Sequence, residues 1–275
     1  MTLVTTRFAP SPTGLLHLGH AASAWFAAER SAGGRFLLRI EDIDRGRCRE
    51  PFVEAIFEDL AWLGLTWAPE VRRQSLHFLD YAKALEILRG RDLLYPCFCT
   101  RADIKEMAGA PQGPDGPIYP GICRPLSEAE RSDRRAAGMP FALRLKMDEA
   151  MRQAGSLTWE DAAAGIQEAR PDLFGDAVLA RKDTPASYHL AVTWDDAAQG
   201  VTLVTRGIDL FPASHLHRLL QALLDLPVPR WHHHPLLTGD DGRRLAKRDG
   251  APSIRSLREA GVTPEQVRRS ALFAG

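Results

Sequence analysis

The sequence predicts an α/β fold built on a Rossmann-like, doubly wound parallel sheet with helices packed against it. Two observations lead to this prediction. Strand-like and helical segments alternate along the first part of the chain, and further strand-like runs resume after a cysteine-containing stretch of different character. Alternating strands and helices form parallel sheets, because each helix carries the chain back to the same end of the sheet.

The first segments read as strand, helix, strand and helix. Residues 4–9 form a short extended run, which the sequence Pro-Ser-Pro-Thr-Gly at 10–14 breaks. Residues 18–32 have helical spacing and end at two glycines, which are typical of a helix C-terminus. Residues 35–41 then read as a buried strand, and Pro51 opens a second amphipathic helix.

Later strand-like runs complete the predicted sheet domain. They lie at 177–181, 188–194 and 201–206, and an amphipathic helix with four leucines follows at 216–223. The three histidines at 232–234 read as a strand, because neighbouring side chains of an extended segment point to opposite faces and do not converge on a metal.

These segments divide the chain into four parts. Residues 1–95 and 168–236 form the two halves of the sheet domain, and residues 96–167 form an insertion with a Pro- and Gly-rich loop and a capped helix. Residues 237–275 form a charged loop and two short helices. The pair at 195–196, two aspartates, reads as a helix start or a turn.

Composition limits the classes of function. Lys plus Arg and Asp plus Glu both number 35, so the formal net charge is zero. A protein that holds nucleic acid over a wide surface usually carries positive charge, so any RNA partner must meet a local patch or bind briefly. No apolar run approaches the roughly 20 residues of a membrane span, and the N-terminus lacks the apolar core of a secretory signal. We expect a cytoplasmic protein without membrane association.

The most informative stretch is a glycine-bearing turn that leads into the first helix. His17 and His20 lie three residues apart on the first helical turn, where free N–H groups and the helix dipole favour an anion. Gly19 lets the backbone approach a nucleotide closely. A second glycine-flanked basic loop, residues 242–250, could close over the same phosphates. The alternative is two ordinary histidines and a solvated loop.

Three of the four cysteines fall in one stretch, at Cys97, Cys99 and Cys123. Clustered cysteines in a chain without a secretory signal indicate a metal site, with buried metal-free thiols as the alternative. Cys48 stands apart and reads as an ordinary thiol.

Several stretches resemble the class I aminoacyl-tRNA synthetases, in particular their glutamyl branch. Residues 7–20 (RFAPSPTGLLHLGH) resemble the extended HIGH signature of that branch. Residues 39–45 (RIEDIDR) are similar to its R-x-E-D-T-D strand end, and residues 204–210 (VTRGIDL) match its V-x-R-G-x-D-L element. The resemblance implies a HIGH-type class I catalytic domain.

Length distinguishes the members of this branch. A full glutamyl-tRNA synthetase continues through helical domains that read the anticodon, whereas this chain has about 25 residues after the basic loop. It resembles the truncated glutamyl-queuosine tRNA(Asp) synthetases. That resemblance implies ATP-dependent, tRNA-independent activation of L-glutamate to glutamyl-adenylate. It further implies transfer of the glutamate to queuosine, the modified wobble base of tRNA(Asp).

The resemblance also implies roles for individual residues. The residues that would hold glutamate are Arg7, Ser11, Glu41, Tyr188 and Arg206. Glutamate has two carboxylates and one ammonium, so its pocket needs guanidinium donors and one acid, and Glu41 would pair with the ammonium. Which arginine holds the side-chain carboxylate stays open.

The ATP side of the implied site consists of His17, Gly19, His20 and Lys247, of which both histidines and the lysine would be catalytic together with Mg²⁺. The α-carboxylate is already ionised at pH 7, so its attack on the α-phosphorus needs no general base. The loop around Lys247 departs from the KMSKS pattern, because residues 244–248 read RLAKR. Its first Lys is Arg and its Ser positions are Ala and Arg.

Zinc is the metal implied for the insertion, held by Cys97, Cys99, Tyr119 and Cys123 in a closed structural site. A phenolate is an uncommon fourth ligand, so Tyr119 has the least support from general zinc chemistry.

Three rival functions remain open from the sequence. One is a truncated glutamyl-tRNA synthetase that needs a partner to read anticodons. Another is a catalytically inactive RNA-binding paralogue, which the altered basic loop favours. A different nucleotidyltransferase is the third, but it would leave Arg7, Glu41 and Arg206 without a role.

Overall fold

The computed structural model describes residues 3–106, 111–237 and 252–271. Lys247 and the whole basic loop at 242–250 lie outside the described residues. Within the described part of the chain, no helix combines the length and the apolar character needed to cross a membrane.

The N-terminal part is a three-stranded parallel sheet with one helix in each of its two crossovers. Strands β1 (Thr5–Phe8), β2 (Arg35–Ile40) and β3 (Arg72–Arg73) pair in parallel. Helices α1 (Leu18–Arg30) and α2 (Glu50–Trp62) bury their apolar faces against this sheet, as their sequence spacing predicts.

A second sheet, which contains β11 and β12, lies beside β1. Strand β11 (Leu203–Gly207) pairs in parallel with β12 (Arg230–His234) and lies beside β1, where the Thr202 N–H donates to the Thr5 carbonyl over 3.0 Å. The strands therefore follow the order β3-β2-β1-β11-β12. Successive strands are thus added first on one side of β1 and then on the other. This reversal of the strand order at β1 is typical of the doubly wound arrangement that the sequence predicts.

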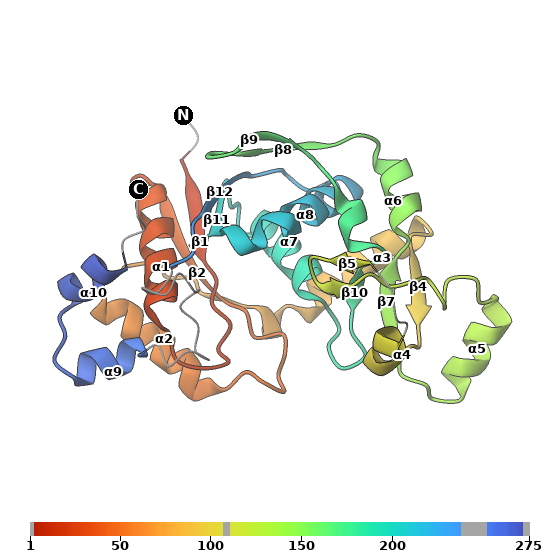
Figure 1. The fold of residues 1–275 in the computed structure, drawn as a ribbon, viewed down its shortest axis with the longest axis horizontal. Helices are drawn as coiled ribbons and strands as arrows, with labels where there is room; N and C mark the ends of the chain where they lie inside the picture. Colours follow the sequence, from red (N-terminus) through yellow and green to blue (C-terminus); the bar gives the residue numbers. More distant parts are fainter. Residues whose placement is uncertain (1–2, 107–110, 238–251, 272–275) are drawn as a thin grey trace.

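The remaining sheets come from the middle of the chain. Strands β8 (Thr158–Asp161) and β9 (Gly165–Glu168) form a hairpin whose Asp161 pairs with Trp231 of β12. Figure 1 shows this hairpin above β12, and the sheet and helices around β4 at the opposite end of the molecule from α1. That distal region contains β4 (Leu94–Cys97), β7 (Ala142–Leu145), β10 (Val178–Ala180), the hairpin β5 (Gln112–Gly113) and β6 (Gly116–Pro117), α4 (Arg101–Glu106), α5 (Glu128–Ala136) and α6 (Met147–Ala154).

The strand predicted at 177–181 is present as β10, but it belongs to a different sheet from the one expected. It pairs antiparallel with β7, which also pairs antiparallel with β4. This strand therefore joins the distal region and not the parallel sheet. Strand propensity identified the element but could not identify its partner, because pairing depends on contacts distant in sequence.

The strand predicted at 188–194 is wrong, because this segment is helix α7 (Tyr188–Ala198). Ser187 caps the helix by accepting a hydrogen bond from the Leu190 N–H. Both faces of the helix are buried, so its apolar run lacks the amphipathic period that distinguishes helix from strand. Asp195 lies inside this helix and not at its start.

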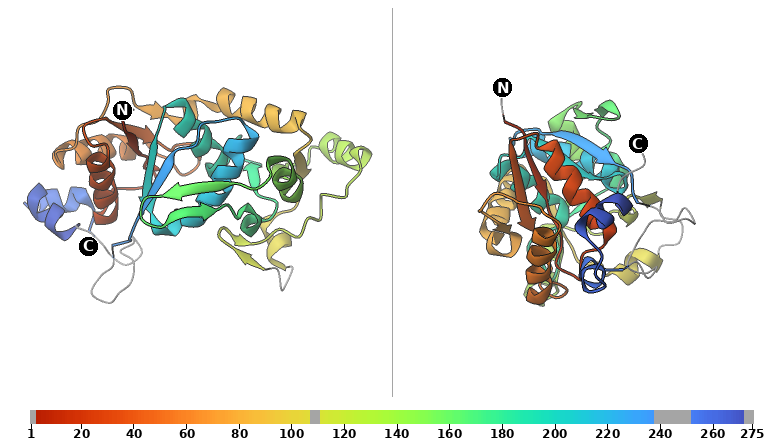
Figure 2. Two further views of the ribbon diagram at one scale, coloured as in Figure 1. Left: turned by 90° about the horizontal axis from the view of Figure 1, so that it is seen from above. Right: turned by 90° about the vertical axis from the view of Figure 1, so that its left-hand side faces the viewer.

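Further helices surround this centre: α3 (Phe78–Gly90), α8 (Phe211–Leu223), α9 (Ile254–Glu259), α10 (Pro264–Ser270) and the short 3₁₀ segments η1 (Gln74–Leu76), η2 (Pro171–Phe174) and η3 (Ile208–Leu210). Helix α8 is the predicted leucine-rich helix, and it packs against α7 and α6. Helices α9 and α10 pack against α2 and α1, so the C-terminal segment returns to the N-terminal sheet (Figure 2).

Candidate active site

A cavity of about 470 Å³ opens where β1, β2 and β11 end. It brings together every described residue for which the sequence implied a substrate role: Arg7, Ser11, His17, Gly19, His20, Glu41, Tyr188 and Arg206. Open parallel sheets place their ligand sites at the carboxyl ends of the strands, where the strand order reverses. The cavity lies at that position.

The two histidines are held by the start of α1 itself. His17 is the N-cap, and its Nδ1 accepts a hydrogen bond from the Gly19 N–H over 3.1 Å. The His20 Nδ1 accepts from the His17 N–H over 3.2 Å. Each neutral ring therefore carries its proton at Nε2, and the ring centroids lie 3.9 Å apart. Two N–H donors are thus fixed beside the positive end of a helix, which suits a polyphosphate.

The described flanks of the basic loop both lie next to this turn. Leu236 and Leu237, just before the loop, line the cavity. Ser253, just after it, forms a β-bridge with His17, and the Ile254 N–H donates to the Leu16 carbonyl over 2.8 Å. The described residues on either side of the basic loop, 236–237 and 253–254, therefore lie at this cavity and at this turn.

Arg7 is paired with a protein carboxylate. Its Nε lies 2.9 Å from Oδ1 of Asp196, on α7, and its Nη1 donates to the Thr205 carbonyl. Arg39 binds the same Asp196 oxygen over 2.7 Å. Burial by itself raises the pKa of Asp196, but the two guanidinium groups outweigh it and hold that pKa below its usual value. One negative charge is thereby shared between two buried cations.

Glu41 follows β2 and is 9% exposed at the cavity wall. Its Oε1 lies 3.8 Å from Nε of Arg39. Burial raises the pKa of Glu41 to about 7, although Arg39 and Arg7 act in the opposite direction. An incoming cation would stabilise the ionised form of this buried carboxyl group. The position therefore fits a site for an ammonium group.

Arg206 differs from Arg7 because neutral groups hold it. Its guanidinium donates to His217 and His233 over 3.2 Å each and to the Ser214 hydroxyl over 2.6 Å, and the Tyr188 hydroxyl lies 3.5 Å away. It forms no salt bridge with any carboxylate among the described residues. Its positive charge thus remains available to a ligand in the cavity.

The sequence interpretation missed several of these supporting residues. The sequence reads Asp196 as part of a turn or helix start, gives His217 no role, and gives the imidazole of His233 no role beyond packing in its strand. The predicted strand at 232–234 is confirmed as β12. The available sequence signal is the concentration of histidines at 189, 215, 217 and 232–234. Imidazoles that the fold buries need hydrogen-bonding partners.

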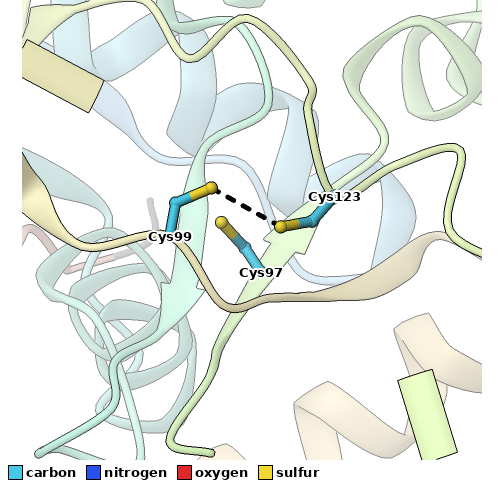
Figure 3. A group of neighbouring side chains, drawn as sticks. All are labelled: Cys97, Cys99 and Cys123. Atoms are coloured by element: carbon cyan, nitrogen blue, oxygen red, sulfur yellow. Dashed lines mark hydrogen bonds between the residues drawn. The ribbon is translucent and has the colours of Figure 1, made fainter. Parts of the chain in front are cut away.

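The three predicted metal-ligand cysteines converge in the distal region. Figure 3 shows the sulfurs of Cys97, Cys99 and Cys123 pointing toward one another. All three lie within 4.8 Å of one another, and the Cys99 and Cys123 sulfurs are 3.5 Å apart. The Tyr119 hydroxyl lies 3.5 Å from the Cys99 sulfur and accepts from the Cys123 N–H. These residues could bind a metal ion.

The spacing of these donors suits a tetrahedral ion. Thiolates bound to zinc at about 2.3 Å lie about 3.8 Å apart at the corners of a tetrahedron. The Cys99–Cys123 distance is slightly shorter than this edge. Cys48 lies elsewhere, against the Glu41 carbonyl, and takes no part in the cluster.

Comparison with known proteins places the chain in a family. Residues 3–275 match the family model of the class I tRNA synthetases (E and Q), catalytic domain. The chain is 50% identical to a glutamyl-Q tRNA(Asp) synthetase of Rhodobacter capsulatus over 96% of this chain and 98% of the relative. It is 45% identical to that of Symbiobacterium thermophilum over 95% of this chain and 83% of the relative.

Longer proteins are similar over part of their length. A glutamate–tRNA ligase of Aquifex aeolicus is 40% identical over 97% of this chain, which spans 56% of that relative. The crystal structure of a glutamate tRNA ligase from Elizabethkingia meningosepticum, in complex with its amino acid, matches with a TM-score of 0.75 and 28% identity. That match covers 90% of this chain and 53% of the other. By the match to the family model and by its full-length relatives, the chain belongs to the class I tRNA synthetases for Glu and Gln, within the glutamyl-Q tRNA(Asp) synthetases.

Proposed function

We propose that the chain uses ATP to activate L-glutamate to glutamyl-adenylate without tRNA, and transfers the glutamate to the queuosine of tRNA(Asp). The observation that carries this proposal is the single cavity that joins the two helix-start histidines to Arg206 and Glu41. Family membership and the names of the full-length relatives support the same reaction.

Each charged group of glutamate has a partner in this arrangement. Glu41 receives the ammonium group. The α-carboxylate must face the ATP at the start of α1. Arg7 is already paired with Asp196, whereas Arg206 forms no salt bridge among the described residues. We therefore assign the side-chain carboxylate of glutamate to Arg206. Tyr188 adds its hydroxyl beside this guanidinium, and Ser11 and Arg7 complete the wall.

Catalysis of adenylate formation consists of positioning and charge stabilisation. The α-carboxylate attacks the α-phosphorus, its new C–O–P linkage forms, and pyrophosphate leaves. His17 and His20 donate to the phosphates from Nε2, and Gly19 admits the nucleotide to the backbone. Lys247, which lies outside the described residues, would supply a further positive charge to the phosphates. Mg²⁺ bound together with ATP would neutralise phosphate charge.

We further propose that the ion held by Cys97, Cys99, Tyr119 and Cys123 is structural zinc, and that residues 96–167 act as the zinc-binding insertion between the catalytic halves 1–95 and 168–236. Three sulfurs and one phenolic oxygen leave no coordination position for substrate. The fourth part, residues 237–275, then carries the lid loop.

Metal analysis tests the zinc proposal. Protein purified without chelators should contain about one equivalent of zinc, because three thiolates hold this ion tightly. Cys123→Ser should lower the content severalfold, and Cys48→Ser is the matched control that should leave it unchanged. Wild-type protein with less than about half an equivalent would contradict the assignment.

ATP–pyrophosphate exchange tests the proposed reaction. Exchange should depend on glutamate and should proceed without tRNA. In a second assay, labelled glutamate should appear on tRNA(Asp) that contains queuosine and not on the same tRNA with an unmodified wobble base.

Arg206→Ala should raise the KM for glutamate far more than the KM for ATP.

The 40% identity to glutamate–tRNA ligases supports a second candidate, the charging of tRNA(Glu). The same exchange assay separates the two. Exchange that requires tRNA(Glu) would favour this candidate, and a wild-type chain without any exchange would favour an inactive RNA-binding protein.

A further inference from the structure

The buried edge of Arg206 is held by three neutral acceptors. Its Nε donates to Nε2 of His233 over 3.2 Å, its Nη1 to Nδ1 of His217 over 3.2 Å, and its Nη2 to Oγ of Ser214 over 2.6 Å. Arginine can only donate, so each of these ring nitrogens must be an acceptor. These three bonds hold the guanidinium in its plane from the protein interior. On the side of the cavity, the guanidinium faces Tyr188.

This constraint determines the tautomers of a chain of imidazoles. The proton of neutral His217 lies on Nε2, which donates to Nδ1 of His189 over 3.1 Å. The proton of neutral His189 then lies on Nε2, which donates to Oδ2 of Asp115 over 2.8 Å. Both rings belong to buried residues, and Asp115 lies in the turn between β5 and β6. A chain of hydrogen bonds thus runs from Arg206 through His217 and His189 to the exposed carboxylate of Asp115.

A second branch holds the other ring. The His233 Nδ1–H donates to Oδ2 of Asp161 over 2.7 Å, and both side chains are 1% exposed. The second carboxylate oxygen of Asp161 accepts from the Ala163 and Ala164 N–H groups over 2.9 Å each. The β8–β9 turn therefore fixes the ring that receives Nε of Arg206.

The electrostatic consequence follows from comparison with Arg7. Asp196 forms a salt bridge with Arg7, whereas Arg206 hydrogen-bonds neutral groups and forms no salt bridge with a carboxylate among the described residues. Burial lowers the pKa of His217, and it lowers the pKa of His233 to about 4, so both rings are neutral at pH 7. They orient the guanidinium without compensating its charge.

We propose that His217 and His233 are positioning residues that fix the Arg206 guanidinium while leaving its charge to the substrate, and that they thereby set the preference for glutamate over glutamine. The inference rests on the proposed function and deepens it. A carboxylate gains a charge-assisted bond to this guanidinium, but a neutral carboxamide gains less and must turn its own N–H donors away.

The experiment compares His217→Leu with His217→Asn in glutamate-dependent ATP–pyrophosphate exchange. The Leu variant removes the acceptor, whereas Asn places an amide oxygen near the position of Nδ1. His215→Leu is the matched control, because His215 lies on the same helix and bonds Trp159 and Arg170 but not Arg206. KM values for glutamate and ATP, the glutamate-to-glutamine ratio of kcat/KM, and thermal unfolding are measured for each.

His217→Leu should raise the KM for glutamate about tenfold or more, the effect of one lost bond to a charged group. It should change the KM for ATP by less than about threefold and lower the glutamate-to-glutamine ratio by about tenfold. His217→Asn should recover most of this loss, and His215→Leu should keep the wild-type ratio even where it lowers the unfolding temperature.

Several results would overturn the inference. These are an unchanged glutamate KM in His217→Leu, an equal rise in both KM values, no rescue by Asn, or the same loss of ratio in His215→Leu. Ser214→Ala removes only one hydroxyl and provides the same test if His217→Leu does not fold, with an expected severalfold rise in glutamate KM alone. Absence of exchange in the wild type would instead refute the proposed function, and the positioning roles with it.

Discussion

Glu41 shows how one residue gains its chemistry from its surroundings. A carboxylate at the end of a strand is ordinarily ionised at neutral pH. Here its 9% exposure raises the cost of ionisation, and the nearby guanidinium of Arg39 is already shared with Asp196. The pKa of Glu41 rises to about 7 as a result. An ammonium group placed against it would restore the ionised form.

This setting predicts a pH dependence for glutamate use. Below the pKa of about 7 the free chain holds Glu41 protonated, and a neutral carboxyl cannot balance an ammonium. The kcat/KM for glutamate should therefore rise with pH through about 7 and then level off, measured by pyrophosphate exchange. Glu41→Gln should lower kcat/KM by about tenfold or more and remove this step. A wild-type profile that stays flat from acid to neutral pH would contradict the role.

At the scale of elements, we propose that the start of α1 binds phosphate, because two imidazoles cap the helix and present donors at its positive end. Both Nδ1 atoms are used within the turn, which orients both Nε2–H groups. Gly19 leaves room for the capping ring, since a Cβ at this position would lie 3.0 Å from Cε1 of His17 and would press against that ring. The His-x-Gly-His spacing therefore matches the geometry of the turn, in which both rings cap the helix and a glycine leaves room for the first ring.

Gly19→Ala should turn the His17 ring out of its capping position. The lost cap should lower the free energy of unfolding by about 1 kcal/mol, and the displaced donor should lower kcat for exchange about tenfold or more. Gly90→Ala at the end of α3 is the control, because a Cβ there meets nothing within 4 Å. Equal exchange rates in the two variants would show that His17 tolerates the extra methyl group.

At the scale of the whole molecule, buried ion pairs join the N-terminal strands to α7. Asp196 binds Arg7 of β1 and Arg39 of β2, and its neighbour Asp195 binds Arg72 of β3 over 2.7 Å. These residues are more than 100 positions apart in sequence. The cavity wall is thus assembled only when the two parts of the sheet domain come together.

Asp196→Ala should destabilise the fold strongly. It leaves two buried guanidinium groups without their carboxylate, which costs about 3–5 kcal/mol when one partner of a buried pair is removed. Urea denaturation measures this loss. Asp172→Ala provides the comparison, because its pair with Arg170 is solvent-exposed and should contribute about 1 kcal/mol or less. Similar losses in both variants would show that the Asp196 pairs do not hold the two parts together.

Sequence alone determined the features that depend on local chemistry. The parallel strands β1 and β2 and helices α1, α2 and α8 follow from hydrophobic period and breaking residues. The spacing of His17 and His20 and the motifs around Arg7, Glu41 and Arg206 identified the residues that line the cavity. The three cysteines were identified in the same way.

The partners of those residues depend on contacts that form in the folded chain. The segment at 188–194 is a helix whose two faces are both buried, so its apolar run carries no amphipathic period that would distinguish a helix from a strand. Asp196 compensates the charge of Arg7, whereas His217 and His233 orient Arg206 without compensating it. These contacts join residues far apart in the chain. Their charge balance depends on burial and on distances that only the folded chain sets, so no local pattern can encode it.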